Sequence, residues 1–439
     1  MRTRRFAGVA ATVTIAASLS VLTVPGSALA DSAHVLPVSS HRQTVADGTH
    51  RQVYSSAPGN DAVVVSDFDG RLITTIEHLE GAWGLALSGD EKTLYVALPE
   101  ADAIAAVDTT TLSETRRFAI GGVGEPENLA VAGGKLWFSH GDTGNGGIGS
   151  ISIGAPEPTV DLGDVPPGTW YGQPLLRAAS ADSDRLVAGE TEVSPGALRV
   201  YDVGSGLARE TAYNEAPGGT VQDMAVTPDG RSVVTAATAP EYHQEFRLSD
   251  LTEVHRYETG VYPITVAVAP DGTVAAGIGL GEEKDVWVYR PGATTPVQTV
   301  DLSSGYYPEL VPQSLAWAPD KSRLFAVRFT MDSQVILDVV EDPDKAPGTL
   351  AVDAPATALV GREFTMRGTL SSSLPYGAGT TVVVKRDGVP VAAPAVAADG
   401  TFAVTDRPTR LGTSAYTVTY AGDADHVAAS TVATVEVVH

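Results

Sequence analysis

The fold of this chain is decided by three short segments: LALSGD at residues 85–90, LYVA at residues 94–97 and IAAVD at residues 104–108. An alanine between two leucines suits a strand that crowds a central axis, because only a small side chain fits there. The Ser-Gly-Asp group makes a tight turn into the second segment. That segment is continuously apolar, as expected of a strand buried on both faces. The unit therefore predicts successive strands of one small sheet.

The same unit recurs along residues 41–340. An apolar-Ala-apolar group, or a worn form of it, lies near residues 45, 86, 130, 177, 225, 267 and 316, in steps of about 41 to 49 residues. Repeats of this length are typical of the four-stranded blades of a β-propeller. One blade cannot bury both of its faces alone, and closing the ring solves this problem. Seven anchors predict seven blades, and six or eight blades remain open.

The last repeat lacks an outer strand. Its third strand is expected at residues 335–340 and is followed at once by the polar group Glu341-Asp342-Pro343-Asp344. Residues 33–38, which lie ahead of the first repeat, could supply the missing strand. The ring would then be closed by joining its two ends in one sheet.

Residues 94–97 and 105–108 resemble the YVTN-type repeat of secreted bacterial propellers, in which a strand like Leu-Tyr-Val-Ala is followed by one ending in Val-Asp. The Pro-Asp-Gly turns at residues 228–230 and 270–272 are similar to those of that group and of tryptophan–aspartate-repeat propellers. The resemblance covers residues 41–340. It implies a fold and no single function, since such propellers include scaffolds, lactonases, lyases and cofactor-bearing dehydrogenases.

The N-terminus has the three parts of a secretory signal. Basic residues at positions 2, 4 and 5 precede an apolar run over residues 6–24, and Pro25-Gly26 breaks it before the Ala-Leu-Ala site at residues 28–30. We expect a signal peptide over residues 1–30 and a secreted, extracellular protein that could stay associated with the cell surface. An uncleaved membrane anchor is the alternative, because the apolar run is nearly long enough to span a bilayer.

The chain is strongly acidic and has no cysteine. Its formal net charge of −24 becomes −27 when the three arginines of the signal are removed. Such a chain repels nucleic acid and anionic membranes at long range, so we expect neither as a partner and no membrane insertion after signal cleavage. Without cysteine there is no disulfide, thiol nucleophile or Cys-based metal site.

The C-terminal part has a different pattern. A polar linker over residues 343–348 ends the predicted propeller domain of residues 31–342, and apolar and polar residues then alternate over residues 349–439. Expected strands cover residues 349–352, 363–370, 381–386, 388–392, 401–405, 415–420 and 431–438. Seven short strands of this kind are typical of an immunoglobulin-like (Ig-like) sandwich. Residues 398–402, 416–423 and 428–430 resemble bacterial Ig-like repeats, which implies a spacer or adhesive module.

In a propeller, the loops that lead into each innermost strand share one face with the loops between strands two and three. These loops bring aromatic and amide groups from several blades to the mouth of the central channel. Expected ligand-binding residues are Trp83, Glu127, Asn128, Trp170, Tyr171, Gln173, Gln222, Tyr262, Tyr306, Tyr307, Gln313 and Arg328. Such a rim suits a neutral polar ligand, such as a glycan or a peptide. Alternatively, the aromatic rings pack between blades and the amides bond the loop backbone.

Catalysis would need titratable groups at the same mouth. His140, Glu190 and His243 are the candidates for acid–base chemistry, and with Glu192 or Asp142 they could hold a divalent metal. These residues form no local motif, and solvated loop residues are the alternative interpretation. The glycine-rich run at residues 141–147 could bind calcium or be a plain hairpin loop. We find no cofactor fingerprint and expect neither a cofactor nor a metal.

The sequence therefore predicts an all-β protein, a seven-bladed β-propeller followed by an Ig-like β-sandwich. We expect an exported, monomeric and non-catalytic binding or scaffold protein whose partner is a glycan, a peptide or a cell-surface protein. A propeller enzyme of lyase or lactonase type is the first alternative. A structural component of a cell wall or matrix is the second.

Overall fold

The computed structural model describes residues 28–439 except 123, 156, 181–182, 280–283 and 303–308. The expected signal peptide therefore lies almost wholly outside the described residues. Within them the chain is built of β-strands, with two short 3-10 turns at Pro58–Asn60 and Pro99–Ala101. No helix in the described part of the chain is long and apolar enough to cross a membrane.

Seven antiparallel sheets follow one another along the described residues up to 341. The first sheet contains β3 (Thr44–Asp47), β4 (Gln52–Ala57), β5 (Ala62–Asp67) and β6 (Leu72–Ile76), and the second contains β7 (Leu85–Leu87), β8 (Thr93–Leu98), β9 (Ala103–Asp108) and β10 (Ser113–Ala119). The third sheet contains β11 (Leu129–Ala132), β12 (Lys135–His140), β13 (Gly146–Ile151) and β14 (Val160–Trp170). The fourth contains β15 (Leu175–Arg177), β16 (Arg185–Gly189), β17 (Gly196–Asp202) and β18 (Arg209–Gly218).

The fifth, sixth and seventh sheets follow the same plan. The fifth sheet contains β19 (Val221–Val226), β20 (Ser232–Ala237), β21 (His243–Arg247) and β22 (Glu253–Tyr257). The sixth contains β23 (Pro263–Val268), β24 (Val274–Ile278), β25 (Val286–Tyr289) and β26 (Gln298–Asp301). The seventh contains β27 (Glu309–Trp317), β28 (Arg323–Phe329), β29 (Val335–Glu341) and β2 (Ser32–Val35). Strand β1 (Ala28–Leu29) adds a short parallel pair to β26.

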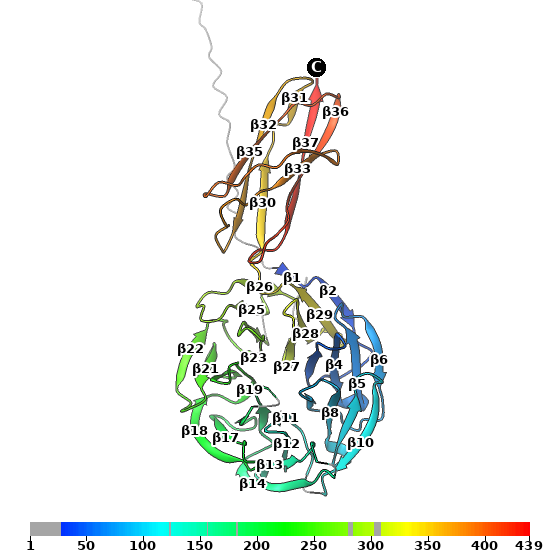
Figure 1. Cartoon of the computed structure of the whole chain (residues 1–439), viewed down its shortest axis with the longest axis vertical. Coiled ribbons are helices and arrows are strands. Elements are labelled where there is room, and N and C mark those ends of the chain that lie inside the picture. Colours follow the sequence, from blue (N-terminus) through cyan, green and yellow to red (C-terminus); the bar gives the residue numbers. More distant parts are fainter. Residues whose placement is uncertain (1–27, 123, 156, 181–182, 280–283, 303–308) are drawn as a thin grey trace, which may run out of the picture.

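The seven sheets are arranged in a closed ring around a common axis (Figure 1). The first strand of each sheet contacts the first strand of the next, and β27 contacts β3, which closes the circle. Apolar clusters fill the spaces between neighbouring sheets. One of them joins Val53 and Val64 of the first sheet to Phe325 and Leu337 of the seventh. The face-to-face burial of whole sheets is the main source of stability in the ring.

The expected closure of the ring is confirmed. Strand β2 pairs antiparallel with β29, so the beginning and the end of the ring share one sheet. Leu36, which follows β2, is 3% exposed and belongs to the apolar cluster between the seventh and first sheets. Its neighbour Val35 is 60% exposed.

The C-terminal sheets form a separate layered unit. One sheet has the order β30 (Gly348–Asp353), β32 (Phe364–Ser372) and β35 (Thr401–Asp406), and the other has the order β31 (Thr357–Leu359), β37 (Ala429–Val438), β36 (Gly412–Tyr420), β33 (Val383–Arg386) and β34 (Val389–Ala392). Both sheets contribute to a single apolar core. The seven strands expected here are present, and β31 is an additional strand that pairs parallel with β37.

Ion pairs and hydrogen bonds of charged side chains hold the connection between the ring and the C-terminal sheets. Arg290 of the sixth sheet pairs with Asp425 at 2.7 Å and donates hydrogen bonds to the carbonyl of Asp344. Lys321 pairs with both Asp271 and Asp344. Ala346 is buried in the apolar cluster between the sixth and seventh sheets. Figure 1 shows the C-terminal sheets extending from the rim of the ring beside β26.

If Leu36 locks the closing strand, truncating it will destabilise the ring much more than truncating its neighbour. We expect Leu36→Ala to lower the free energy of unfolding by about 2–4 kcal/mol, the usual cost of emptying a buried leucine site. The exposed Val35→Ala change is the matched control and should stay within about 0.5 kcal/mol of the wild type. Urea unfolding followed by tryptophan fluorescence measures both, and equal effects would contradict the assigned closure.

Candidate functional site

The loops that lead into the first three sheets are joined side by side at one end of the channel. The amide of Arg42 donates to the carbonyl of Ser56 at 3.0 Å, and the Ser56 hydroxyl donates to the carbonyl of Trp83 at 2.5 Å. The amide of Gly84 then donates to the carbonyl of Glu127 at 3.0 Å. These bonds hold Arg42, Trp83 and Glu127 in neighbouring positions. We name these three residues the mouth cluster.

Gly84 is required for this close packing. A Cβ atom at this position would lie 2.1 Å from the carbonyl oxygen of Glu127 and 3.1 Å from the Cα of Asn128. Backbone atoms cannot move aside as a flexible side chain can, so a larger residue must separate the second and third loops.

Arg42 is a half-buried cation whose side chain has no hydrogen-bond or ion-pair partner among the described residues. Its guanidinium carbon lies 4.7 Å from the centre of the Trp83 ring, a favourable cation–π distance. Its Nε atom is buried without a hydrogen bond, and the described residues offer its guanidinium no ion pair. The Nε1 atom of Trp83 is likewise buried and unpaired. Burial is the main cause that lowers the pKa of Arg42 from its usual value.

Glu127 is the acidic member of the mouth cluster. Burial, together with the nearby Glu192 and Glu125, raises its pKa to about 7, and Arg42 acts in the opposite direction. Arg42 and Glu127 influence each other's charge, but they do not form an ion pair within 4.0 Å. The guanidinium of Arg42 and the carboxyl group of Glu127 are therefore close enough to shift each other's pKa without forming an ion pair.

Below the mouth cluster, a polar side chain spans the channel. Arg177 of the fourth sheet donates to Asp223 at 3.1 Å and to the Oε1 atom of Gln313 at 2.7 Å. Gln313 belongs to the seventh sheet, so this bond crosses the ring between sheets that are not neighbours. Asp223 also accepts hydrogen bonds from Thr265 and from the amide of Val266, both at 3.0 Å. We name Arg177, Asp223 and Gln313 the floor. The charged groups of the floor are paired with each other.

The channel also contains space beside Arg177. A small cavity of about 190 Å³ is lined there by Gln43, Leu85, Leu87, Leu129, Ala130, Val131, Leu176, Arg177, Ala178 and Ser180. Arg177 thus takes part both in the polar contacts of the floor and in the lining of this cavity.

The amide side chains of the expected ligand site are mostly used within the protein. Asn128 is 1% exposed and donates to Ser139 Oγ at 3.3 Å, although its Oδ1 atom has no partner. Gln173 is buried and donates to the carbonyl of Gly141. Gln313 accepts from Arg177, and Gln222 is half-buried. This bonding agrees with the alternative interpretation, in which the amides hold the loops.

The aromatic residues of the expected rim have different positions. Tyr171 and Tyr262 are exposed, whereas Trp170 is 2% exposed and ends the outer strand β14. Contrary to the expectation of a mouth residue, Trp170 packs in the core between the third and fourth sheets, against Ile148 and Tyr201. Tyr306 and Tyr307 lie outside the described residues.

The three candidates for catalysis lie in separate surroundings. His140 ends β12 and His243 begins β21, so both belong to strands and not to loops. His243 contacts Thr259 at 3.0 Å and the carbonyl of Thr265 at 3.1 Å, and burial lowers its pKa to about 4. Burial also lowers the pKa of His140, whose ring lies against Phe138. Glu190 accepts a hydrogen bond from the amide of Tyr171 at 3.1 Å.

No described contact joins any two of these three residues. In addition, no group of three or more His, Asp or Glu side chains within the described ranges is placed to hold a metal ion.

Arg328 is bound inside the seventh sheet. It pairs with the fully buried Asp338 at 2.6 Å. Burial raises the pKa of Asp338 to about 6, with Arg328 opposing it. Asp285 of the sixth sheet also has a pKa raised to about 6, mainly by burial, and it accepts the amide of Leu302 at 2.7 Å. Arg328 therefore serves a buried acidic pair instead of the channel mouth.

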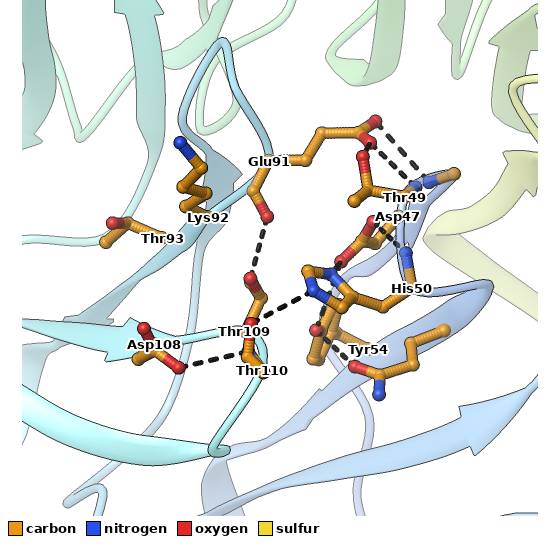
Figure 2. A network of polar contacts seen from close by, with 12 residues as sticks. Asp47, Thr49, His50, Tyr54, Glu91, Lys92, Thr93, Asp108, Thr109 and Thr110 are labelled. Carbon is orange, nitrogen blue, oxygen red and sulfur yellow. Dashed lines mark hydrogen bonds and ion pairs between the residues drawn. The ribbon is translucent and has the colours of Figure 1, made fainter.

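A second polar network lies at the opposite end of β3 (Figure 2). His50 contacts the buried Asp47 at 2.8 Å and the exposed hydroxyl of Thr110 at 3.1 Å. This order resembles a nucleophile–base–acid relay, but the amides of Thr110 and Thr111 both donate to Asp108 and leave no donor pair for an oxyanion. Glu91, in the loop after β7 of the second sheet, also accepts a hydrogen bond from Thr49, in the loop after β3 of the first sheet. The network therefore joins the first and second sheets.

Comparisons with known proteins agree with the ring architecture. No known protein family and no curated protein matches the sequence. Among solved structures, hydrazine synthase of Kuenenia stuttgartiensis is similar with a TM-score of 0.55 at 16% identity, covering 70% of this chain and 97% of that chain. The β-propeller domain of Cps50 (Swd1) from Myceliophteria thermophila has a TM-score of 0.53 at 14% identity, covering 70% and 98%. These similarities show a β-propeller fold and do not show a function.

Replacing Gly84 tests the packing that supports the mouth cluster. We expect Gly84→Ala to destabilise the protein by about 1–3 kcal/mol, because the new methyl group overlaps the carbonyl of Glu127. The same change at Gly154, where a Cβ would meet nothing within 4 Å, is the control. Thermal unfolding gives the stability of both variants. A Gly84→Ala protein as stable as the Gly154→Ala protein would contradict the described loop contact.

The buried acidic pair predicts a measurable pH dependence. Because its folded-state pKa is raised, the Asp285 carboxyl contributes stability at acidic pH that is lost as the pH rises through about 6. Asp285→Asn keeps an acceptor for the amide of Leu302 and removes this loss. We expect the variant to be more stable than the wild type at pH 8 by on the order of 1–2 kcal/mol, with the difference vanishing near pH 4.

Urea unfolding at both pH values measures this effect. Asp332→Asn on the exposed surface is the control and should follow the wild type. If Asp285→Asn gives the same gain at both pH values, the raised pKa is not the cause.

Proposed function

We propose that this protein is an exported, non-catalytic binding protein that holds a ligand at the mouth of a seven-bladed propeller. In this proposal residues 1–30 are a removed signal peptide, residues 31–342 form the propeller and residues 349–439 form an Ig-like domain that spaces or docks the propeller. The closed ring of seven described sheets and the propeller-like solved structures support the architecture.

One observation carries the proposal: Arg42 is half-buried beside Trp83, and its side chain has no hydrogen-bond or ion-pair partner among the described residues. Burying an unpaired cation costs free energy, and a bound ligand can recover it. The floor residues Arg177, Asp223 and Gln313, by contrast, are fully engaged with one another. An unpaired guanidinium beside an unpaired indole N–H indicates recognition of a ligand at the mouth cluster.

An enzyme of lyase or lactonase type gains no support from the positions of its candidates. His140, Glu190 and His243 have separate partners and no described contact joins any two of them, whereas acid–base catalysis requires groups that converge on one reacting centre. A neutral or mixed-charge small ligand, a glycan or a peptide is the partner class that the mouth fits. The net charge of −24 argues against nucleic acid.

A combined glycan and peptide array on the secreted protein tests the proposal. We expect at least one class of ligand to bind, and we expect Arg42→Gln to weaken it by about tenfold or more, the usual loss for a charged hydrogen bond. Arg51→Gln is the matched control. Arg51 also lies over an aromatic ring, Phe68 at 4.5 Å, but it belongs to the opposite end of the ring and pairs with Asp320.

If no ligand binds, or if Arg42→Gln and Arg51→Gln weaken binding equally, the mouth cluster is not the binding site.

A further inference from the structure

The mouth cluster presents two opposite charges that do not neutralise each other. Arg42 has no ion pair among the described residues, and Glu127 comes no closer to it than the limit of an ion pair. Elsewhere in the ring, arginines pair directly with acidic residues, as Arg177 does with Asp223 and Arg328 with Asp338. The separation of Arg42 from Glu127 is therefore a particular feature of the mouth.

The acidic side of the mouth is larger than Glu127 alone. The charged groups that act on Glu127 are Arg42 on one side and Glu125 and Glu192 on the other. Glu125 and Glu192 are exposed, and Glu192 accepts a hydrogen bond from Thr143 at 3.2 Å. A purely anionic ligand would meet these carboxylates, and a purely cationic ligand would meet Arg42. A ligand that carries both charges satisfies both sides.

Neighbouring buried groups add neutral hydrogen-bonding capacity. The Nε1 atom of Trp83 is a buried donor without a partner, and the Oδ1 atom of Asn128 is a buried acceptor without a partner. Asn128 is 1% exposed and directly follows Glu127. A hydrogen-bond donor, the Nε1 atom of Trp83, thus lies beside the cation Arg42. An acceptor, the Oδ1 atom of Asn128, belongs to the residue beside the acid Glu127.

We propose that the mouth cluster binds a small zwitterion, an α-amino acid or a short unblocked peptide, with its carboxylate on Arg42 and its ammonium group on Glu127. This inference rests on the proposed binding function and specifies its ligand. The ammonium group favours the ionised form of Glu127, whose pKa in the free protein is about 7. Affinity should therefore rise between about pH 6 and about pH 8, as Glu127 loses its proton.

Blocked ligands test the inference on the unaltered protein. Isothermal titration calorimetry is carried out with standard amino acids and dipeptides, and with their N-acetyl and C-amide forms. We expect unblocked ligands to bind and each block to weaken binding by about tenfold or more, because each removes one charged contact. This comparison needs no variant and does not depend on how a substitution affects folding.

Two variants assign the charges. In Arg42→Gln, the C-amide block should not weaken binding further, because the contact with the ligand carboxylate is already lost. In Glu127→Gln, the N-acetyl block should likewise cause no further loss of affinity. Glu127→Gln should also remove the rise in affinity with pH. Circular dichroism and thermal unfolding establish that both variants are folded.

The outcomes separate the inference from the function on which it rests. Affinity that rises as the pH falls, with tolerance of the N-acetyl block, identifies an anion site and overturns the zwitterion. The same holds if the arrays give an Arg42-dependent ligand and no unblocked amino acid or dipeptide binds. If nothing binds in an Arg42-dependent manner, the proposed function fails as well.

Discussion

Each sheet of the ring can bury both of its faces only when it has a neighbour on either side. The apolar clusters follow this constraint, since each one joins residues of two adjacent sheets. The cluster made by Val53, Phe325 and Leu337 does the same between the last sheet and the first. The channel, the loops around its mouth and the positions of their side chains all depend on this continuous side-to-side packing, which leaves no sheet with an uncovered face.

The mouth illustrates how a rigid ring can hold charges apart. Two backbone hydrogen bonds and one from the Ser56 hydroxyl fix the loops that carry Arg42, Trp83 and Glu127, and Gly84 allows two of these loops to touch. The side chains therefore do not need to pair with each other in order to be held. The floor shows the opposite arrangement, because Arg177, Asp223 and Gln313 bond one another across the channel. Pre-organised, unsatisfied groups reduce the cost of ordering a site when a ligand binds.

The repeat could be predicted because its physical cause is local. The segments at 85–90, 94–97 and 104–108 form β7, β8 and β9 with bounds close to those expected. Trp170 is expected in a loop that leads into an innermost strand, but it is the last residue of the long outer strand β14, whose sequence VDLGDVPPGTW contains two prolines. His140 and His243 are expected in the loops between second and third strands; His140 is the last residue of β12 and His243 the first residue of β21, so each lies at a strand end beside such a loop. Arg42 is not among the expected site residues, because it belongs to a degenerate copy of the repeat. It nevertheless lies just ahead of β3, much as Glu127 lies just ahead of β11.

The pairing of β2 with β29 has a consequence for the order in which the protein can mature. The amide of Glu341 bonds Asp31, a residue 310 positions earlier in the chain. During synthesis the first strand to emerge from the ribosome must therefore wait for nearly the last strand of the ring. Until then the seventh sheet lacks its edge, and two hydrogen-bonding edges are open to other chains. Such long-range closure slows folding, so the time spent unclosed sets the interval in which the nascent protein is most vulnerable to aggregation and proteolysis.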